Sequence, residues 1–186
     1  MSRGVGSLAL LADAVGWLTR RRVKCGLFGA FAMATYGIAR FTGDADLLVV
    51  DGGILSSAFW RGFPGEARLV WGNGEDPFAG AVQLSRSQCI TVDIVIGRFP
   101  WQCRLLERAQ WRQLGGLRLQ VLQLPDLILT KLFAGGVQDR ADVLLLMGAL
   151  DARQRRQLAA RMRVLPEDAR KLYRELVALA ASRQRV

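Results

Sequence analysis

The chain has 186 residues, a length that fits one domain or one domain with a small appendage. Apolar residues make up 51%, which excludes a disordered chain, and the net charge of +10 favours nucleic acids, nucleotides or acidic surfaces as partners. The chain has no histidine, which excludes Ser-His-Asp and Cys-His nucleophile systems and histidine metal sites. Catalysis would therefore depend on carboxylates, lysine, backbone dipoles or a metal.

The cysteines and the apolar segments predict a cytoplasmic protein without a membrane partner. Cys25, Cys89 and Cys103 are widely spaced and form no CxxC pair, so neither a zinc site nor a disulfide framework is indicated. No segment approaches the roughly 20 apolar residues that a membrane span needs. The apolar run near the N-terminus is interrupted by Asp13 and followed by three arginines, which favours an amphipathic helix over a signal peptide.

The first part of the chain alternates helical and strand patterns, which predicts an α/β domain over residues 1–122. Gly29 interrupts the pattern after the first expected strand, and Gly37 can end the next helix in the left-handed conformation. We expect helices over 7–20, 30–37, 54–63 and 101–111, and strands over 23–28, 44–50, 67–71, 81–85, 89–97 and 117–124.

After residue 124 the pattern becomes helical throughout. Pro125, the pair Gly135-Gly136 and Pro166 separate segments with helical spacing, which predicts helices over 125–135, 139–150, 152–162 and 166–182. We therefore expect an α/β domain over residues 1–122, followed by a helical region over 123–186 that packs on it and shares its core. The chain would belong to the α/β (α+β) class.

A pair of acids opens the apolar strand expected over residues 44–50. Alternate residues of a strand point to the same face, so the carboxylates of Asp44 and Asp46 can converge on one point. Two carboxylates held close repel each other, and one pKa rises unless a cation neutralises them. Mg²⁺ or Mn²⁺ suits this need because both prefer oxygen ligands. The alternative is a solvated turn that happens to precede a strand.

A third acid lies in the middle of the clearest strand of the chain. Asp93 is flanked by Val92 and Ile94, where an uncompensated carboxylate would cost several kcal/mol. If this strand neighbours the one that carries the acid pair, Asp93 becomes the third oxygen ligand of a metal site. A solvated sheet face or a pairing with an arginine is the alternative. Upstream, Gly29 and Ala30 follow a strand and open a helix, an arrangement in which backbone N–H groups attract phosphate.

Together these motifs resemble the signature of the DNA polymerase β-like nucleotidyltransferase superfamily. That signature is a glycine pair followed by two acids that alternate with apolar residues, and here thirteen residues separate Gly29-Ala30 from Asp44 and Asp46. Asp93 matches the third acid on a later strand. The run over residues 29–49 is similar to that of small bacterial nucleotidyltransferases, including abortive-infection type toxins of toxin–antitoxin pairs. One residue departs from the pattern, because Ala30 replaces the usual serine or glycine and has no hydroxyl for a phosphate.

The resemblance implies a mixed β-sheet flanked by helices and the transfer of a nucleoside monophosphate from a nucleoside triphosphate to an acceptor. Two Mg²⁺ ions would bridge the acids and the triphosphate. Asp44 and Asp46 would bind metal and triphosphate, while Asp93 would bind the metal that activates the acceptor and help remove its proton. The amides of Gly29 and Ala30 would hold the phosphates.

Relatives of this kind also carry a later lysine that precedes an Asp-x-x-Asp group, which Lys131, Asp139 and Asp142 match. Lys131 would reach the phosphates as a point charge, or its ammonium group could extend to solvent from an apolar helix. Asp142 precedes an apolar run and is favoured over Asp139 for facing inward, although both also suit the start of a helix.

The residues before the acid pair and the basic C-terminal part complete the predicted contacts. Arg40 and Thr42 are candidate nucleotide contacts. From Asp151 to Val186 ten Lys or Arg stand against four Asp or Glu, so 36 residues carry +6 of the net charge of +10. This part is either a set of solvated helix faces or a surface for RNA or another polyanion.

Three functional hypotheses follow from these observations. The leading one is a Mg²⁺-dependent nucleotidyltransferase that acts on RNA, protein or a small molecule. A toxin with an antitoxin partner is one form that such an enzyme would take. The second, motivated by Ala30, is a catalytically inactive module of the same fold that binds nucleotide, RNA or a partner protein. The third is a nucleic-acid-binding protein that depends on the basic C-terminal part alone.

Overall fold

The structure is a computed structural model that describes residues 7–74 and 76–183. Contacts within the chain divide it into two compact units, Met1–Leu122 and Gln123–Val186. In the part of the chain that the structure describes, no helix is long and apolar enough to cross a membrane.

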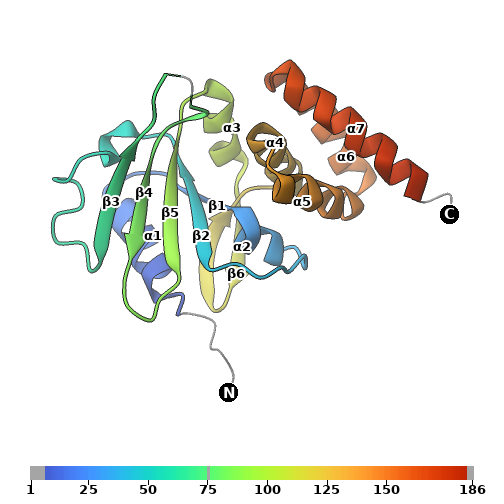
Figure 1. The fold of residues 1–186 in the computed structure, drawn as a ribbon. Coiled ribbons are helices and arrows are strands. Elements are labelled where there is room, and N and C mark those ends of the chain that lie inside the picture. The colour runs from blue at the N-terminus through green and yellow to red at the C-terminus, as the bar shows by residue number, and fades with distance from the viewer. Residues whose placement is uncertain (1–6, 75, 184–186) are drawn as a thin grey trace. The chain divides into compact units, whose positions relative to one another are not determined.

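A seven-stranded mixed sheet forms the first unit, with the strand order β3-β4-β5-β2-β1-β7-β6 (Figure 1). The central strand β2 is parallel to β5 and antiparallel to β1, and β1 is parallel to β7. The strands are β1 (Gly26–Phe28), β2 (Asp44–Val49), β3 (Glu66–Trp71), β4 (Phe78–Ser85), β5 (Thr91–Gly97), β6 (Gln110–Leu114) and β7 (Leu117–Val121).

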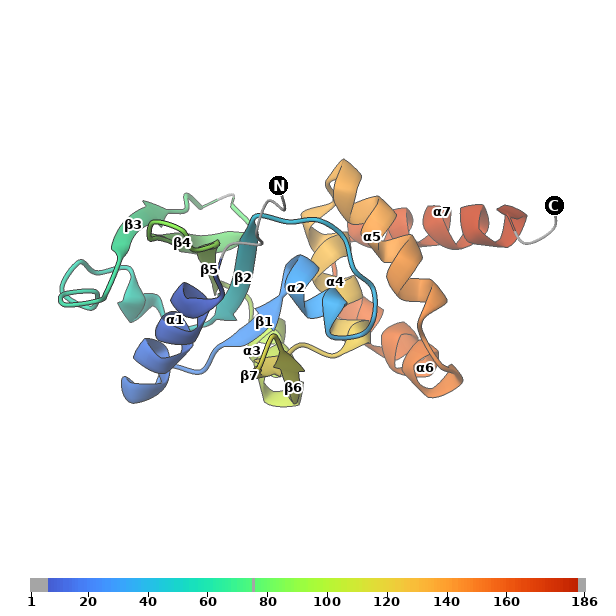
Figure 2. The same cartoon turned by 90° about the horizontal axis from the view of Figure 1, so that it is seen from below.

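The core of this unit follows from the alternation along its central strands. Every second residue of β2 and β5 is apolar, and these side chains are at most 1% exposed: Ala45, Leu47, Val49, Val92, Ile94 and Ile96. The helix α1 (Ala9–Arg20) packs against β4 and β5 and buries Leu10, Leu11 and Leu18 (Figure 2). Each fully buried aliphatic side chain contributes about 1.5–3 kcal/mol to folding. The alternate positions carry Asp44 and Asp46 before the apolar Leu48 in β2, and Thr91 and Asp93 before the apolar Val95 in β5.

Two short helices border the sheet. The six-residue helix α2 (Gly29–Ala34) begins directly at the end of β1, and Gly37, with φ +80°, lies in the turn that follows. The helix expected over 30–37 is thus shorter and starts one residue earlier. The helix α3 (Pro100–Arg108) begins with a proline in its first turn, where the missing N–H has no helical partner to lose.

The prediction of a helix over residues 54–63 is wrong. The segment forms only the 3₁₀ turn η1 (Gly52–Ile54) and a series of turns. Trp60 donates its indole N–H to the carbonyl of Ile54 at 2.8 Å, and its ring packs edge-on against Phe63 with centroids 5.4 Å apart. Phe63 packs in the same way against Trp17 of α1. Anchoring of these aromatic rings in the core outweighs the weak local preference for a helix.

A strand was also missed next to α3. The helix ends at Arg108 instead of continuing to Trp111, and β6 pairs antiparallel with β7. Gly115 and Gly116 connect the two strands with φ values of +52° and +84°, which are the positive angles that a two-residue hairpin turn requires. The glycine pair between alternating residues was the available sequence signal for this hairpin.

The second unit is helical, as predicted. Its helices are α4 (Leu124–Ala134), α5 (Val137–Gly148), α6 (Ala152–Arg161) and α7 (Glu167–Arg183), with the 3₁₀ turn η2 (Met162–Val164) before α7. Gly135 ends α4 in the left-handed conformation with φ +68°, and Asp151 caps α6 by accepting the N–H of Gln154 at 2.7 Å. Leu127 and Ile128 of α4 are fully buried.

Candidate active site

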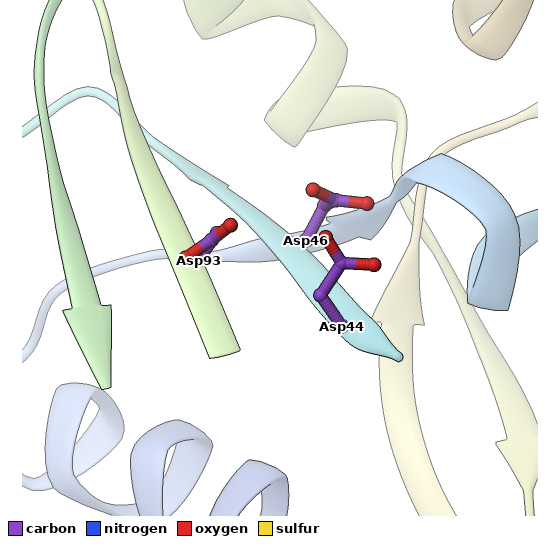
Figure 3. A group of neighbouring side chains, drawn as sticks. All are labelled: Asp44, Asp46 and Asp93. Atoms are coloured by element: carbon purple, nitrogen blue, oxygen red, sulfur yellow. The ribbon is translucent and has the colours of Figure 1, made fainter. Parts of the chain in front are cut away.

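Three carboxylates meet on one face of the central sheet. In the register between the parallel strands β2 and β5, Asp46 lies opposite Asp93 and Asp44 lies opposite Thr91. Because alternate residues share a face, Asp44, Asp46 and Asp93 project on the same side and toward one another (Figure 3). One carboxylate oxygen from each lies within 4.8 Å of the others, and all three residues are half-buried. The structure therefore brings together the three acids expected to bind metal.

Gly29 is required by the close approach of this cluster. The strand β1 ends at Phe28, which pairs with Asp46, so the turn into α2 lies directly against the second acid. Gly29 has φ +69°, and a Cβ built on it would overlap the Oδ2 atom of Asp46. Any other residue would both strain the backbone and displace this carboxylate. Ala30 follows as a buried residue in the first turn of α2.

The residues before the acid pair differ in their contacts. The hydroxyl of Thr42 donates a hydrogen bond to the carboxylate of Asp44, so Thr42 orients this acid. The Nη1 atom of Arg40 donates to the carbonyl of Phe41 at 3.3 Å in an exposed part of the loop. Thr42 thus has a contact in the acid cluster that sequence reasoning did not assign to it.

The environment of Asp93 disfavours its ionised form. Burial raises the pKa of Asp93, and the nearby charge of Asp44 raises it further, while a hydrogen bond from Gln83 lowers it. The net pKa is higher than that of an ordinary aspartate. A divalent cation bound between the carboxylates would favour the ionised form.

Gln83 and Arg68 extend this row of polar residues across the sheet. Gln83 lies opposite Asp93 in the register of β4 with β5, and Arg68 lies opposite Gln83 in the register of β3 with β4. The Nη1 atom of Arg68 donates to the Oε1 atom of Gln83 at 3.5 Å. Sequence reasoning missed both residues, because neither belongs to a motif and only the strand register aligns them with Asp93.

An open cavity of about 550 Å³ lies beside the acid cluster. It reaches Asp44 and Asp93 at one side and continues over β3 and β4. Its remaining polar lining comes from Glu66, Arg68, Gln83, Ser85 and Thr91. The cavity thus offers hydroxyl, amide and charged groups next to Asp93, without an aromatic ring in its lining.

The later lysine and its two acids gather within the second unit. The Nζ atom of Lys131 lies 2.8 Å from Asp139 Oδ1 and 2.9 Å from Asp142 Oδ2. Burial lowers the pKa of Lys131, but the hydrogen bonds and charges of the two aspartates outweigh it, so the net pKa is raised. Asp142 is fully buried and also accepts the amide N–H of Gln138 at 3.1 Å. Asp142 is therefore the inward-facing acid of the two, as expected.

A second buried ion pair in the helical unit was not expected. Asp126 is fully buried in the first turn of α4, and its Oδ1 atom lies 2.9 Å from Nη1 of Arg161. Both terminal nitrogens of Arg161 also donate to Oε1 of Gln123 at 3.3 Å. The pair joins α6 to the start of α4, so part of the charge on the basic helices has an internal partner.

Comparison with known proteins gives the fold a name. No model of a protein family and no curated protein sequence matches the chain. Among solved structures, a proposed nucleotidyltransferase of Thermotoga maritima matches with a TM-score of 0.53 and 16% identity, over 77% of this chain and 93% of that one.

Two further structures resemble the chain at lower TM-scores. The antibiotic-resistance factor ANT(2'')-Ia matches at 0.49 with 12% identity, over 96% of this chain and 95% of that one. A proposed nucleotidyltransferase of H. pylori matches at 0.45 with 17% identity, over 94% and 93%. The fold expected from the sequence is confirmed by the Thermotoga protein: the chain has the nucleotidyltransferase fold.

Proposed function

We propose that the chain is a metal-dependent nucleotidyltransferase that transfers a nucleoside monophosphate from a nucleoside triphosphate to an acceptor. The observation that carries this proposal is the convergence of Asp44, Asp46 and Asp93, whose oxygens lie within 4.8 Å of one another. Carboxylates at this separation repel one another unless a cation compensates them. The fold shared with the Thermotoga protein supports nucleotidyl transfer as the chemistry of this cluster.

The donor set fits a hard divalent cation. Three carboxylates supply the oxygen ligands that Mg²⁺ and Mn²⁺ prefer, and the pKa of Asp93 is raised by burial first and by the nearby charge of Asp44 second. Asp44, Asp46 and Asp93 would hold the ion. When bound, the ion would supply a Lewis acid that neutralises charge on the triphosphate and polarises the acceptor hydroxyl.

The side chains around Asp93 would prepare the acceptor. Asp93 borders the polar cavity, so an acceptor hydroxyl placed there lies within reach of its carboxylate. Asp93 would accept the hydroxyl proton while the acceptor oxygen bonds to the α-phosphorus, and the bond from that phosphorus to the pyrophosphate oxygen breaks. Gln83 would keep the carboxylate oriented and ionised through its hydrogen bond.

Further residues would bind the nucleotide. We propose that the amides of Gly29 and Ala30 hold the phosphates, because the turn lies against Asp46. Arg40 would contact the nucleotide. Lys131, oriented by Asp142, would neutralise the triphosphate as a point charge.

The acceptor is proposed as a hydroxyl of RNA, protein or a small molecule in the cytoplasm. The basic helical unit supports a polyanionic acceptor such as RNA, since residues 151–186 carry +6 of the net charge. A toxin role, with ATP or another triphosphate as donor and an antitoxin as partner, rests on the resemblance of residues 29–49 to abortive-infection type nucleotidyltransferases.

Transfer of label from α-³²P nucleoside triphosphates tests the proposal. The protein is incubated with Mg²⁺ and each triphosphate in the presence of total RNA, cell protein or a small-molecule extract. Asp46→Asn should reduce labelling by about a hundredfold or more, because it removes a ligand of the ion that stabilises transition-state charge. Asp51→Asn is the matched control, an exposed acid just beyond the other end of β2. Equal labelling by wild type and Asp46→Asn would contradict the proposal.

A catalytically inactive module is the second candidate, favoured by the alanine at position 30. Calorimetry with a nonhydrolysable triphosphate distinguishes the two, because an inert module should show no Mg²⁺-dependent binding of the triphosphate through the acids. Nucleic-acid binding by the basic helices alone predicts a strongly salt-dependent affinity that survives loss of all three acids.

A further inference from the structure

A second cavity lies on the other side of the sheet from the carboxylates. Its volume is about 390 Å³, and its floor includes Leu47 of β2 and Leu119 of β7. Leu47 directly follows Asp46, so by strand alternation its side chain points away from the face of the acid cluster. Val15 of α1 and Leu106 of α3 contribute further apolar wall. We call this space the back cavity; its volume is within the range of small-molecule sites.

One wall of the back cavity is a fixed aromatic ring. Trp111 of β6 is 57% exposed and lies opposite Gln120 in the register with β7. With its amide oriented to satisfy both contacts, Gln120 accepts the indole N–H of Trp111 at 3.2 Å and donates to the carbonyl of Ala109 at 3.0 Å. The guanidinium of Arg118 lies 5.1 Å from the centre of the indole ring. An indole held in this way loses little entropy when a flat apolar group packs against the cavity wall.

The charged lining of the back cavity favours an anion. Arg22 and Lys24 line it and are exposed, and neither forms an ion pair with a carboxylate within residues 7–74 and 76–183. Glu107 is the carboxylate in the lining, so the charged groups sum to a positive net charge. Arg22 has φ +60° just after α1, where glycine is the usual residue. The Arg22 side chain is thus carried on a strained backbone.

We propose that the back cavity binds a small amphipathic anion with a flat aromatic body and one carboxylate or sulfonate group. The apolar floor and Trp111 would receive the aromatic body, and Arg22 and Lys24 the anionic group. Cys25 also lines the cavity; burial raises its pKa to about 11, so its thiol stays neutral and adds a soft apolar surface instead of a nucleophile. This site is independent of the proposed transfer reaction.

A pair of fluorescent probes that differ in one charge tests the proposal. The probes are 1-anilinonaphthalene-8-sulfonate and its neutral counterpart N-phenyl-1-naphthylamine, whose fluorescence rises on leaving water. Wild type should bind the anionic probe at one saturable site. Thr19 is an exposed residue of α1 that lines the cavity, and Thr19→Trp should fill this space. The affinity for both probes should fall tenfold or more. Unchanged binding of both probes by this variant would overturn the proposal.

Arg22→Gly separates the charge from the fold. Glycine relieves the positive φ, so the variant should be at least as thermally stable as wild type. It should lower the affinity for the anionic probe about two- to fivefold, which corresponds to the free energy of one exposed ion pair. The affinity for the neutral probe should not change. Equal weakening of both probes, or of neither, would contradict a role of Arg22 in anion binding.

The location can be read from the indole N–H signals of the wild-type protein. Titration with the anionic probe in a ¹H–¹⁵N spectrum should shift the signal of Trp111, assigned by its loss in Trp111→Phe. The signal of Trp71, which is also exposed but lies on β3 at the opposite edge of the sheet, is the matched control and should not move. A shift of Trp71 without one of Trp111 would place the probe elsewhere and overturn the proposal.

Discussion

Gly29 and Gly37 provide a matched pair that tests how the backbone positions the acid cluster. Both glycines have positive φ angles, +69° and +80°, so alanine strains the backbone similarly at either position. They differ in surroundings, because a Cβ at Gly29 would overlap Oδ2 of Asp46, whereas a Cβ at Gly37 would meet no atom within 4 Å. Gly29→Ala should therefore disturb the cluster, and Gly37→Ala should not.

The expected magnitudes separate stability from binding. Left-handed backbone costs a residue other than glycine about 1–2 kcal/mol, which should appear in the free energy of unfolding of both variants. This loss lowers the Tm by about 2–8 °C for a chain of this size. Gly29→Ala should lose more, because Asp46 must also move. Displacement of this carboxylate should weaken divalent-metal binding by about 10- to 100-fold, as when groups that orient metal ligands are removed.

Urea unfolding and Mn²⁺ titration followed by electron paramagnetic resonance measure the two effects separately. We expect Gly37→Ala to unfold at lower urea than wild type and to keep the wild-type affinity for Mn²⁺. Gly29→Ala should lose both stability and affinity. If the two variants bound Mn²⁺ equally well, the approach of the Gly29 turn to Asp46 would have no bearing on the metal site.

Three further predictions concern the charged groups. Asp93→Asn should raise the unfolding free energy of the metal-free protein near neutral pH, because the raised pKa means that ionised Asp93 opposes folding. This gain in stability should shrink as the pH falls through the pKa of Asp93. A loss of stability at neutral pH, measured by urea unfolding, would refute the prediction. Gln83→Leu should weaken Mn²⁺ binding about tenfold, because it removes the hydrogen bond that favours the ionised form of Asp93. The same resonance titration measures this affinity, and an unchanged value would exclude a role of Gln83 in metal binding. Lys131→Met should cost about 3–5 kcal/mol in urea unfolding by leaving buried Asp142 without its cation, whereas exposed Lys171→Met should cost under about 0.5 kcal/mol; equal losses would contradict this.

Local patterns in the sequence predicted most elements of the fold and the face on which the first two acids lie. Alternation places Asp44 and Asp46 on one side of a strand whatever its neighbours are, since side chains of a strand repeat every two residues. The expected strand with Asp93 and the four helices after residue 124 are present as well. Errors arose where long-range packing outweighed local preference, as in the aromatic segment over 54–63 and the strand β6.

The sequence by itself determined that two acids share a face, that a glycine turn precedes them and that a third acid interrupts an apolar strand. Only the tertiary structure decided that Asp93 lies opposite Asp46, that Gln83 and Arg68 continue the same row, and that Gly29 leaves room for a carboxylate. The physical reason is the register between strands, which depends on the packing of the whole sheet and not on any one segment. A shift of β5 by one residue would turn Asp93 to the face of the sheet that α1 packs against, away from its two companions.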